Sequence, residues 1–183
     1  MAVETALGHL VAAVGPESTG KTTLALELAA AFAVPCLPEY AREYLEERLE
    51  RTGDASYDEE DLAAIAREHM RREATFVRSA ERGGVIDTDL IVILVWWSER
   101  FGESPAWLHH AIARQPKRLY LLCAPDLPWQ ADPLRESEHD RERLFDVYQA
   151  ALTELGLPFA IVAGQGGARF EAARNAARPV LGT

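Results

Sequence analysis

One eight-residue stretch constrains the fold of this chain more than any other: Gly15-Pro16-Glu17-Ser18-Thr19-Gly20-Lys21-Thr22. It follows the apolar run Leu10–Val14 and precedes an amphipathic run that reaches Phe32. The stretch fits the pattern G-x-x-x-x-G-K-[ST], and its flanks supply the strand–loop–helix context in which that pattern forms a phosphate-binding loop, the P-loop. The alternative is a glycine-rich turn followed by Lys-Thr by chance. It is disfavoured because the motif and both of its flanks agree with a P-loop.

The residue types in this stretch suit the phosphates of a nucleotide. Gly15 and Gly20 permit a loop whose backbone N–H groups turn inward, and the first N–H groups of the following helix add to the anion site. Lys21 supplies a mobile charge for the outer phosphates, and the Thr22 hydroxyl can ligate Mg²⁺. We therefore predict ATP and Mg²⁺ as cofactors. The predicted cofactor-binding residues are Gly15, Glu17, Ser18, Thr19, Gly20, Lys21, Thr22, Thr23 and, from a later loop, Arg135.

Length, charge and cysteine content narrow the class of protein. The 183 residues are expected to form one domain. A net charge of −10 argues against a general nucleic-acid surface, and the apolar run at Leu10–Val14 is too short to span a bilayer. Cys36 and Cys123 are expected to be reduced, buried thiols. We expect a cytoplasmic protein without nucleic-acid or membrane partners, and the sequence leaves open whether it forms a homo-oligomer.

Short apolar runs alternate with helical patterns along the whole chain, which is typical of a parallel sheet with helices on both faces. We predict an α/β fold of the P-loop NTPase class, a three-layer αβα sandwich with a five-stranded parallel sheet. The expected strands are 10–14, 34–37, 85–87, 118–123 and 158–163, and the expected helices are 21–32, 39–53, 59–81, 90–101, 105–114, 137–155 and one ending near 180. In such sheets ligands bind beyond the carboxyl ends of the strands.

Two aspartates follow the strand expected at 85–87. Asp87 ends an apolar strand, which is the Walker B arrangement, and we predict that it holds Mg²⁺ together with Thr22. Its other role would be a cap for the next helix, for which Asp89 is the better candidate. Asp89 is also close enough in sequence to orient a substrate hydroxyl, so it stays a candidate for both roles.

Glu39 follows the second expected strand, where a carboxylate could accept the proton of an attacking hydroxyl. Arg42 lies one helical turn further and could fix that carboxylate or clamp the acceptor; the alternative is an ordinary ion pair within the helix. Lys21, Glu39, Asp89 and Arg135 are the predicted catalytic residues. The predicted substrate-binding residues are Glu39, Tyr40, Arg42 and Asp89.

A proline-punctuated loop after the fourth strand carries the basic residue needed over the phosphates, Arg135, and is expected to act as a mobile lid near 125–136. Arg141 and Arg143 are interpreted as solvated partners of Glu138 and Glu142. Trp107 and Trp129 are either base-stacking residues or buried loop anchors. The pair His109-His110 has no third ligand at a useful spacing and is interpreted as a surface pair.

Four motifs in this order resemble the ribosylnicotinamide kinase domain of NadR-type proteins: G-x-E-S-x-G-K at 15–21, E-Y-x-R-E at 39–43, D-T-D at 87–89 and W-x-x-D-x-x-R at 129–135. The set covers nearly the whole chain and is far more selective than the P-loop alone. The resemblance implies the strand order 2-3-1-4-5 and the ATP-dependent phosphorylation of nicotinamide riboside, a nucleoside-like partner. It also implies a lid at 126–135 and an adenine site near 164–167.

The acceptor stays open at this stage. The family places aromatic residues around the nicotinamide ring, but the two corresponding positions here are Pro38 and Thr75, so Tyr40, Phe76 or Trp97 would have to replace them. A kinase for another nucleoside or for a vitamin alcohol would use the same machinery. A regulatory ATPase that binds a protein partner is the alternative from another class.

Overall fold

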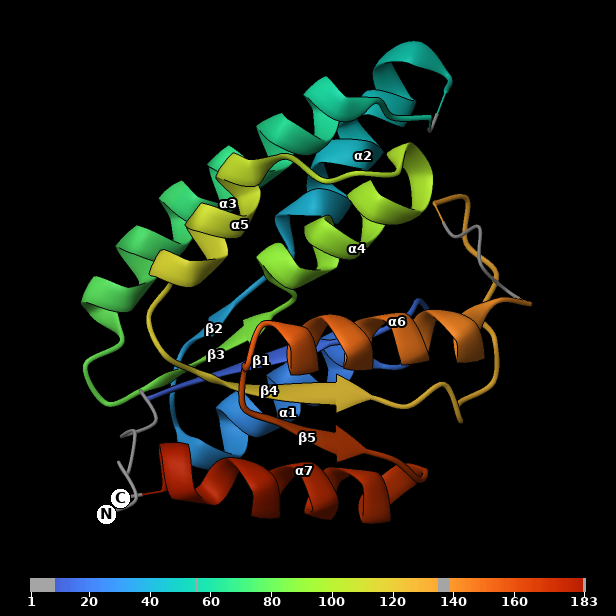
Figure 1. Cartoon of the computed structure of the whole chain (residues 1–183). Coiled ribbons are helices and arrows are strands. Elements are labelled where there is room, and N and C mark those ends of the chain that lie inside the picture. The colour runs from blue at the N-terminus through green and yellow to red at the C-terminus, as the bar shows by residue number, and fades with distance from the viewer. Residues whose placement is uncertain (1–8, 55, 135–138, 183) are drawn as a thin grey trace.

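The structure, a computed structural model (Figure 1), describes residues 9–54, 56–134 and 139–182. Strands and helices alternate along these residues as the sequence predicts. The strands are β1 (Leu10–Val14), β2 (Cys36–Leu37), β3 (Gly84–Asp87), β4 (Leu119–Cys123) and β5 (Phe159–Val162). The helices are α1 (Lys21–Phe32), α2 (Tyr40–Thr52), α3 (Glu59–Ser79), α4 (Leu90–Phe101), α5 (Ala106–Arg114), α6 (Arg141–Glu154) and α7 (Gly166–Leu181).

All five strands pair in parallel, in the order β2-β3-β1-β4-β5. Both the five-stranded parallel sheet and the strand order 2-3-1-4-5 are therefore confirmed. Every residue of β1 is buried, because the strand lies between β3 and β4 and is covered on both faces. This explains the continuous apolar run that precedes the phosphate loop.

The sheet separates two helical layers, as Figure 1 shows. Val11 and Ala13 of β1 face the layer formed by α1 and α7, and Leu10, Ala12 and Val14 face the opposite layer. The second layer is thicker, because α3, α5 and α6 pack against α4 and α2 packs against α3. The three-layer α/β fold is confirmed, and the parallel strands bring the residues that follow β1, β2 and β3 to one end of the sheet.

Two boundaries differ from the expected ones. The helix expected from 137 begins at Arg141, because His139 and Asp140 form a turn, and residues 135–138 lie outside the described part. The helix expected to run to 81 ends at Ser79, two residues earlier. In the described part of the chain no helix combines the length and the apolar character that a bilayer span requires.

Candidate active site

The turn from β1 into α1 has the backbone geometry that its glycines permit. Gly15 has a φ of 132°, and a Cβ atom at this position would lie 2.8 Å from the backbone oxygen of Cys123 on β4. Gly20 has a φ of 72° and is the N-cap of α1. The first turn of α1 contains no acidic residue. The positive end of this helix therefore faces the loop without a carboxylate competing for an anion.

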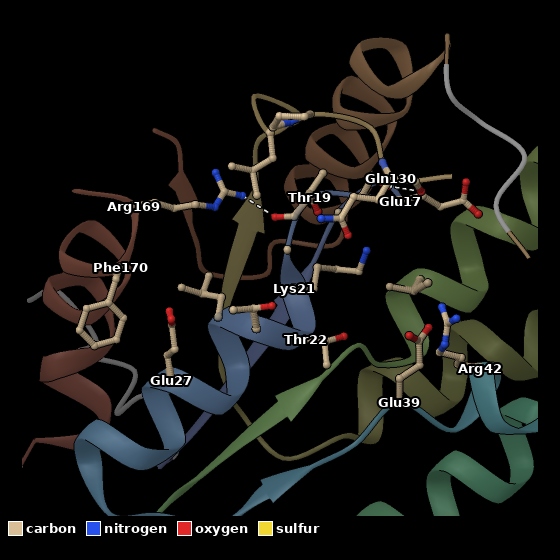
Figure 2. A pocket seen from close by; sticks show the side chains of 18 of the residues that line it. Glu17, Thr19, Lys21, Thr22, Glu27, Glu39, Arg42, Gln130, Arg169 and Phe170 are labelled. Carbon is tan, nitrogen blue, oxygen red and sulfur yellow. Dashed lines mark hydrogen bonds between the residues drawn. The ribbon is translucent and has the colours of Figure 1, made fainter. Parts of the chain in front are cut away.

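Hydrogen bonds within the loop fix its shape. Thr19 Oγ1 donates to the backbone oxygen of Pro16 at 2.9 Å, and Lys21 Nζ donates to the same oxygen at 2.7 Å. Lys21 is half-buried and lines the cavity above α1, as Figure 2 shows. A neutral carbonyl is a weaker partner for an ammonium group than a phosphate would be. The lysine is thus held next to the site where it is expected to act.

Thr22 and Asp87 meet where the sequence predicts the metal pair. Asp87 ends β3 and accepts a hydrogen bond from the Thr22 side chain, yet its Oδ1 is buried with no hydrogen-bond partner among the described residues. Burial raises the pKa of Asp87, against the effects of Thr22 and Lys21. A buried carboxylate oxygen without a donor, beside a threonine hydroxyl, fits the oxygen ligands that Mg²⁺ prefers.

One cavity of about 1030 Å³ contains both the phosphate loop and the predicted acceptor residues. The loop and the start of α1 form its floor. Glu39 and four residues of α2 and α4 form one side, which we call the acceptor side: Glu39, Arg42, Leu45, Val92 and Trp96. Glu27 of α1 lies in the opposite half with residues of α7, including Phe170 (Figure 2).

Glu39 is the N-cap residue of α2, and its carboxylate is enclosed by protein although the residue keeps some exposed surface at the cavity. This burial raises the pKa of Glu39 to about 7, while Lys21 and Arg42 oppose the rise and Asp87 adds to it. The carboxylate can therefore accept a proton near neutral pH, as a general base must. Glu39 lies on the cavity, on the side where the sequence predicts the acceptor.

Arg42 joins the acceptor side to the loop that follows β4. Its guanidinium donates to Asp132 Oδ2 at 2.5 Å and pairs with Glu46 one turn further along α2. In the same loop, the backbone N–H of Gln130 donates to Ser18 Oγ at 3.2 Å. The described part of the predicted lid thus contacts both the phosphate loop and the acceptor side. Arg135, the predicted catalytic residue of the lid, lies outside the described residues.

Two predicted substrate residues lie away from the cavity. Asp89 is 1% exposed, and its carboxylate accepts hydrogen bonds from the backbone of Ile91 and from Arg118. The guanidinium carbon of Arg72 lies 4.1 Å from the centre of the Tyr40 ring. Neither residue lines the cavity. The helix-cap role predicted for Asp89 is confirmed. The acceptor contacts predicted for Asp89 and Tyr40 stay predictions, which the lining of this cavity does not support.

The aromatic residue on the acceptor side is Trp96, which the sequence did not single out. Pro38 and Thr75 are exposed, Phe76 packs under Gly84, and Trp97 is 5% exposed in the core, so neither Phe76 nor Trp97 reaches the cavity. Trp96 lies one turn after Val92 on α4, and both line the cavity. This i, i+4 spacing within the apolar run of α4 was the signal available in the sequence.

Among the described residues, two arginines of α6 have partners that the sequence did not predict, and Glu138, one of the expected partners, lies outside that part of the chain. Arg141 donates to the backbone oxygen of Leu127 at 2.9 Å and lies over the Trp129 ring at 5.7 Å, so it fastens the loop after β4 rather than pairing with a glutamate of its own helix. Arg143 pairs with Asp140 and with Glu99 of α4. Trp129 is accordingly a loop anchor. The two histidines at 109 and 110 are exposed, as predicted.

Arg169 was also missed by the sequence interpretation. It is 5% exposed at the start of α7 and donates to the backbone oxygens of Thr19 at 2.7 Å and Ala124 at 3.2 Å, and to Asp126 Oδ1 at 2.7 Å. It thus connects the phosphate loop with the segments that follow β4 and β5. No motif marks this arginine; its position soon after a strand-ending glycine turn was the available signal.

These features define a P-loop domain of the small-molecule kinase type: a glycine-shaped phosphate loop, a buried carboxylate at the end of the neighbouring strand and the strand order 2-3-1-4-5. The model of a family described as AAA domain matches residues 10–169, and the chain belongs to this family. The chain is similar to NadR-type proteins over most of its length. It is 30% identical over 152 residues to "Trifunctional NAD biosynthesis/regulator protein NadR" of Escherichia coli (strain K12), and equally to that of Salmonella typhimurium (strain LT2).

The match covers 81% of this chain but only 37% of either relative. Solved structures agree with the fold. A NadR protein in complex with NR superposes with a TM-score of 0.78 at 26% identity, covering 97% of this chain and 52% of that one. A NadR protein in complex with NAD and AMP-PNP superposes with a TM-score of 0.75 at 23% identity, covering 97% and 50%. The second likeness concerns the fold alone.

Proposed function

We propose that this domain transfers the terminal phosphoryl group of ATP to a hydroxyl of a nucleoside-like acceptor, with nicotinamide riboside as the first candidate. One observation carries the proposal: a single cavity holds the phosphate loop with Lys21 and, on its acceptor side, the carboxylate of Glu39, whose pKa is about 7. Phosphoryl transfer depends mainly on positioning and on charge neutralisation, and both elements are present. The resemblance to NadR supports the choice of acceptor.

Each residue has a distinct part in this proposal. The loop from Gly15 to Thr22 binds the phosphates through its backbone N–H groups, and Lys21 exchanges the Pro16 carbonyl for a phosphate oxygen. Thr22 and Asp87 would hold Mg²⁺, which when bound neutralises charge on the outer phosphates. Glu39 accepts the proton of the attacking hydroxyl, and Trp96 offers a flat surface to the acceptor.

Incubation with ATP, Mg²⁺ and a panel of acceptors tests the proposal. The panel contains nicotinamide riboside, pyrimidine nucleosides, purine nucleosides and vitamin alcohols, and ³¹P NMR identifies the phosphorylated product. We expect a monophosphate from nicotinamide riboside. A phosphorylated pyrimidine nucleoside or vitamin alcohol in its place would retain the kinase and correct the acceptor. Folded, ATP-binding protein that phosphorylates no member of the panel would refute the proposal.

The role of Glu39 is tested by Glu39→Gln, which keeps the shape of the side chain and removes the base. We expect kcat to fall about 10²- to 10⁴-fold, with ATP affinity unchanged. Since the proton acceptor is the ionised form, kcat/KM of the unaltered chain should rise with pH and level off above about 7, the pKa of Glu39. Glu43→Gln, on the exposed face of the same helix, is the matched control. Unchanged turnover in Glu39→Gln would exclude Glu39 as the base.

A further inference from the structure

The connection from β3 to α4 contains a strained residue next to the metal carboxylate. Only Thr88 and Asp89 separate the end of β3 from the start of α4. Thr88 has a φ of 61° and is 5% exposed. A β-branched residue is a true outlier in the left-handed region, and such a conformation persists only where the surrounding structure holds it. The contacts that hold this turn therefore also set the position of Asp87, the preceding residue.

Backbone contacts hold only part of the turn. The N–H of Thr88 donates to the oxygen of Ala13 on β1 at 3.1 Å, which extends the sheet by one bond. Beyond it, the Asp89 carboxylate divides its oxygens: Oδ1 accepts the N–H of Ile91 at 3.0 Å, and Oδ2 accepts Arg118 Nη1 at 3.4 Å. The Asp89 side chain is fully buried and that of Arg118 is 1% exposed.

Arg118 is itself fixed by α3 and by the segment that follows α5. Its guanidinium donates to both carboxylate oxygens of Glu73 on α3, and its Nε donates to the oxygen of Pro116 at 3.1 Å. Glu73 also accepts Gln115 Nε2 at 2.9 Å, and it lies 3.2 Å from His69 Nε2. Arg118 directly precedes β4, so it reaches Asp89 from the end of the sheet opposite the phosphate loop.

The two aspartates of the D-T-D motif therefore have different surroundings and different roles. Asp89 points into the core and is fully paired, whereas Asp87 Oδ1 is buried without a donor among the described residues. We propose that Arg118 is a positioning residue for the metal: by holding Asp89 it stabilises the left-handed Thr88 turn and so keeps the Asp87 carboxylate aimed at the cation beside Thr22. This inference rests on the metal pair of the proposed function and not on the identity of the acceptor.

Metal binding tests the inference without turnover. Mn²⁺ is titrated into the complex of the full chain with ADP, and free Mn²⁺ is followed by EPR. Asp89→Asn keeps an oxygen for the helix cap but removes the charge that attracts Arg118. We expect about a tenfold weaker Mn²⁺ affinity, the usual size of an effect transmitted through a supporting residue. ADP affinity without metal should not change. Gln115→Met, which trims the same network at Glu73 but does not touch Asp89, should bind Mn²⁺ normally.

A rescue separates positioning from mere stabilisation. Glycine adopts a positive φ without strain. Adding Thr88→Gly to Asp89→Asn should therefore restore most of the Mn²⁺ affinity, although it does not replace the lost ion pair between Asp89 and Arg118. Failure of this rescue, or a lowered Tm with unchanged Mn²⁺ affinity in Asp89→Asn, would overturn the inference.

Arg118→Lys keeps the charge and loses the forked geometry, so it provides the test if Asp89→Asn does not fold. We expect a smaller loss of Mn²⁺ affinity in the same direction, and unchanged affinity would overturn the inference. If the unaltered chain with ADP bound no Mn²⁺ at all, the metal pair itself would be refuted, and this inference with it. A chain that binds Mn²⁺ normally but phosphorylates no acceptor would leave the inference standing and refute the proposed function alone.

Discussion

The turns that follow β1 and β3 are neighbours at one edge of the sheet, but different kinds of residue give each turn its backbone conformation. Both strands end at the ligand edge, and both turns need left-handed backbone. After β1 the requirement falls in part on Ser18, which has a φ of 54°, and mainly on Gly15 and Gly20, which adopt it without strain. After β3 it falls on Thr88, which does not, and whose turn is held by the buried pair Asp89–Arg118. The first turn relies mainly on its own glycines, whereas the second relies on contacts with residues far away in the sequence.

The difference shows two ways in which functional groups are positioned, by neighbouring residues or by distant ones. The phosphate loop can form wherever its eight residues sit between a strand and a helix, which explains why the same pattern occurs in many unrelated enzymes. In our proposal the position of the Asp87 carboxylate depends on Glu73, Asp89 and Arg118, which are far apart in the sequence and meet only in the folded chain. Substitutions should therefore act locally at the first turn and through distant partners at the second.

The largest effect is expected from Gly15→Ala. The new Cβ would be 2.8 Å from the Cys123 oxygen, a backbone atom of a central strand that cannot move aside, and φ is 132°. We expect the free energy of unfolding to fall by about 3 kcal/mol or more, with loss of ADP binding, as measured by urea unfolding and calorimetry. Gly53→Ala is the matched control. Its φ is 72° but its Cβ would meet nothing within 4 Å, so a loss of about 1 kcal/mol is expected.

Equal losses at the two glycines would show that the contact with Cys123 does not matter, and that the phosphate loop is less constrained than the comparison requires.

The fold could be predicted because its signals are local. The apolar runs at β1 and β4, the glycines at several turns and the amphipathic helices between the strands each reflect residues close in sequence. The strand order came from the resemblance and not from these patterns. The start of α6 at Arg141 could not be predicted, because the charged residues before it fit a first helical turn as well as they fit a loop.

The site could be predicted only where a contiguous motif carries it. Lys21, Thr22, Asp87 and Glu39 belong to such motifs and lie where expected. In the sequence, Asp89 has the position expected of a catalytic carboxylate. Its contact with Arg118, 29 residues later, is formed only in the folded chain, where Asp89 points into the core. Arg169 and Trp96 reach the cavity through tertiary packing. The sequence offers only indirect signals for them, a helical spacing for Trp96 and a position after a glycine turn for Arg169, and neither forms a motif.

Arg169 shows that the phosphate side also depends on a distant partner, and its removal is expected to have the second-largest effect. Arg169→Leu would leave the backbone oxygens of Thr19 and Ala124 and the Asp126 carboxylate without this donor. We expect a loss of about 2–3 kcal/mol and weaker ADP binding, because Thr19 belongs to the phosphate loop. Arg174→Leu removes a half-exposed ion pair on the same helix and should cost less than about 0.5 kcal/mol. If Arg169→Leu matched Arg174→Leu in both stability and ADP affinity, the loop would be self-sufficient.

The smallest effect, and the sharpest test of the comparison, is expected at Thr88. Thr88→Gly and Thr88→Ala both remove the buried side chain, but only glycine also removes the strain of a φ of 61°. Their difference therefore isolates the backbone term, and we expect the glycine variant to be the more stable of the two by about 1 kcal/mol in urea unfolding. The direction is opposite to that expected at an ordinary helix or strand position, where alanine is favoured over glycine. Equal stability, or a more stable alanine variant, would mean that the turn after β3 carries no strain. The buried pair Asp89–Arg118 would then have nothing to hold in place, and the distinction between the two turns would disappear.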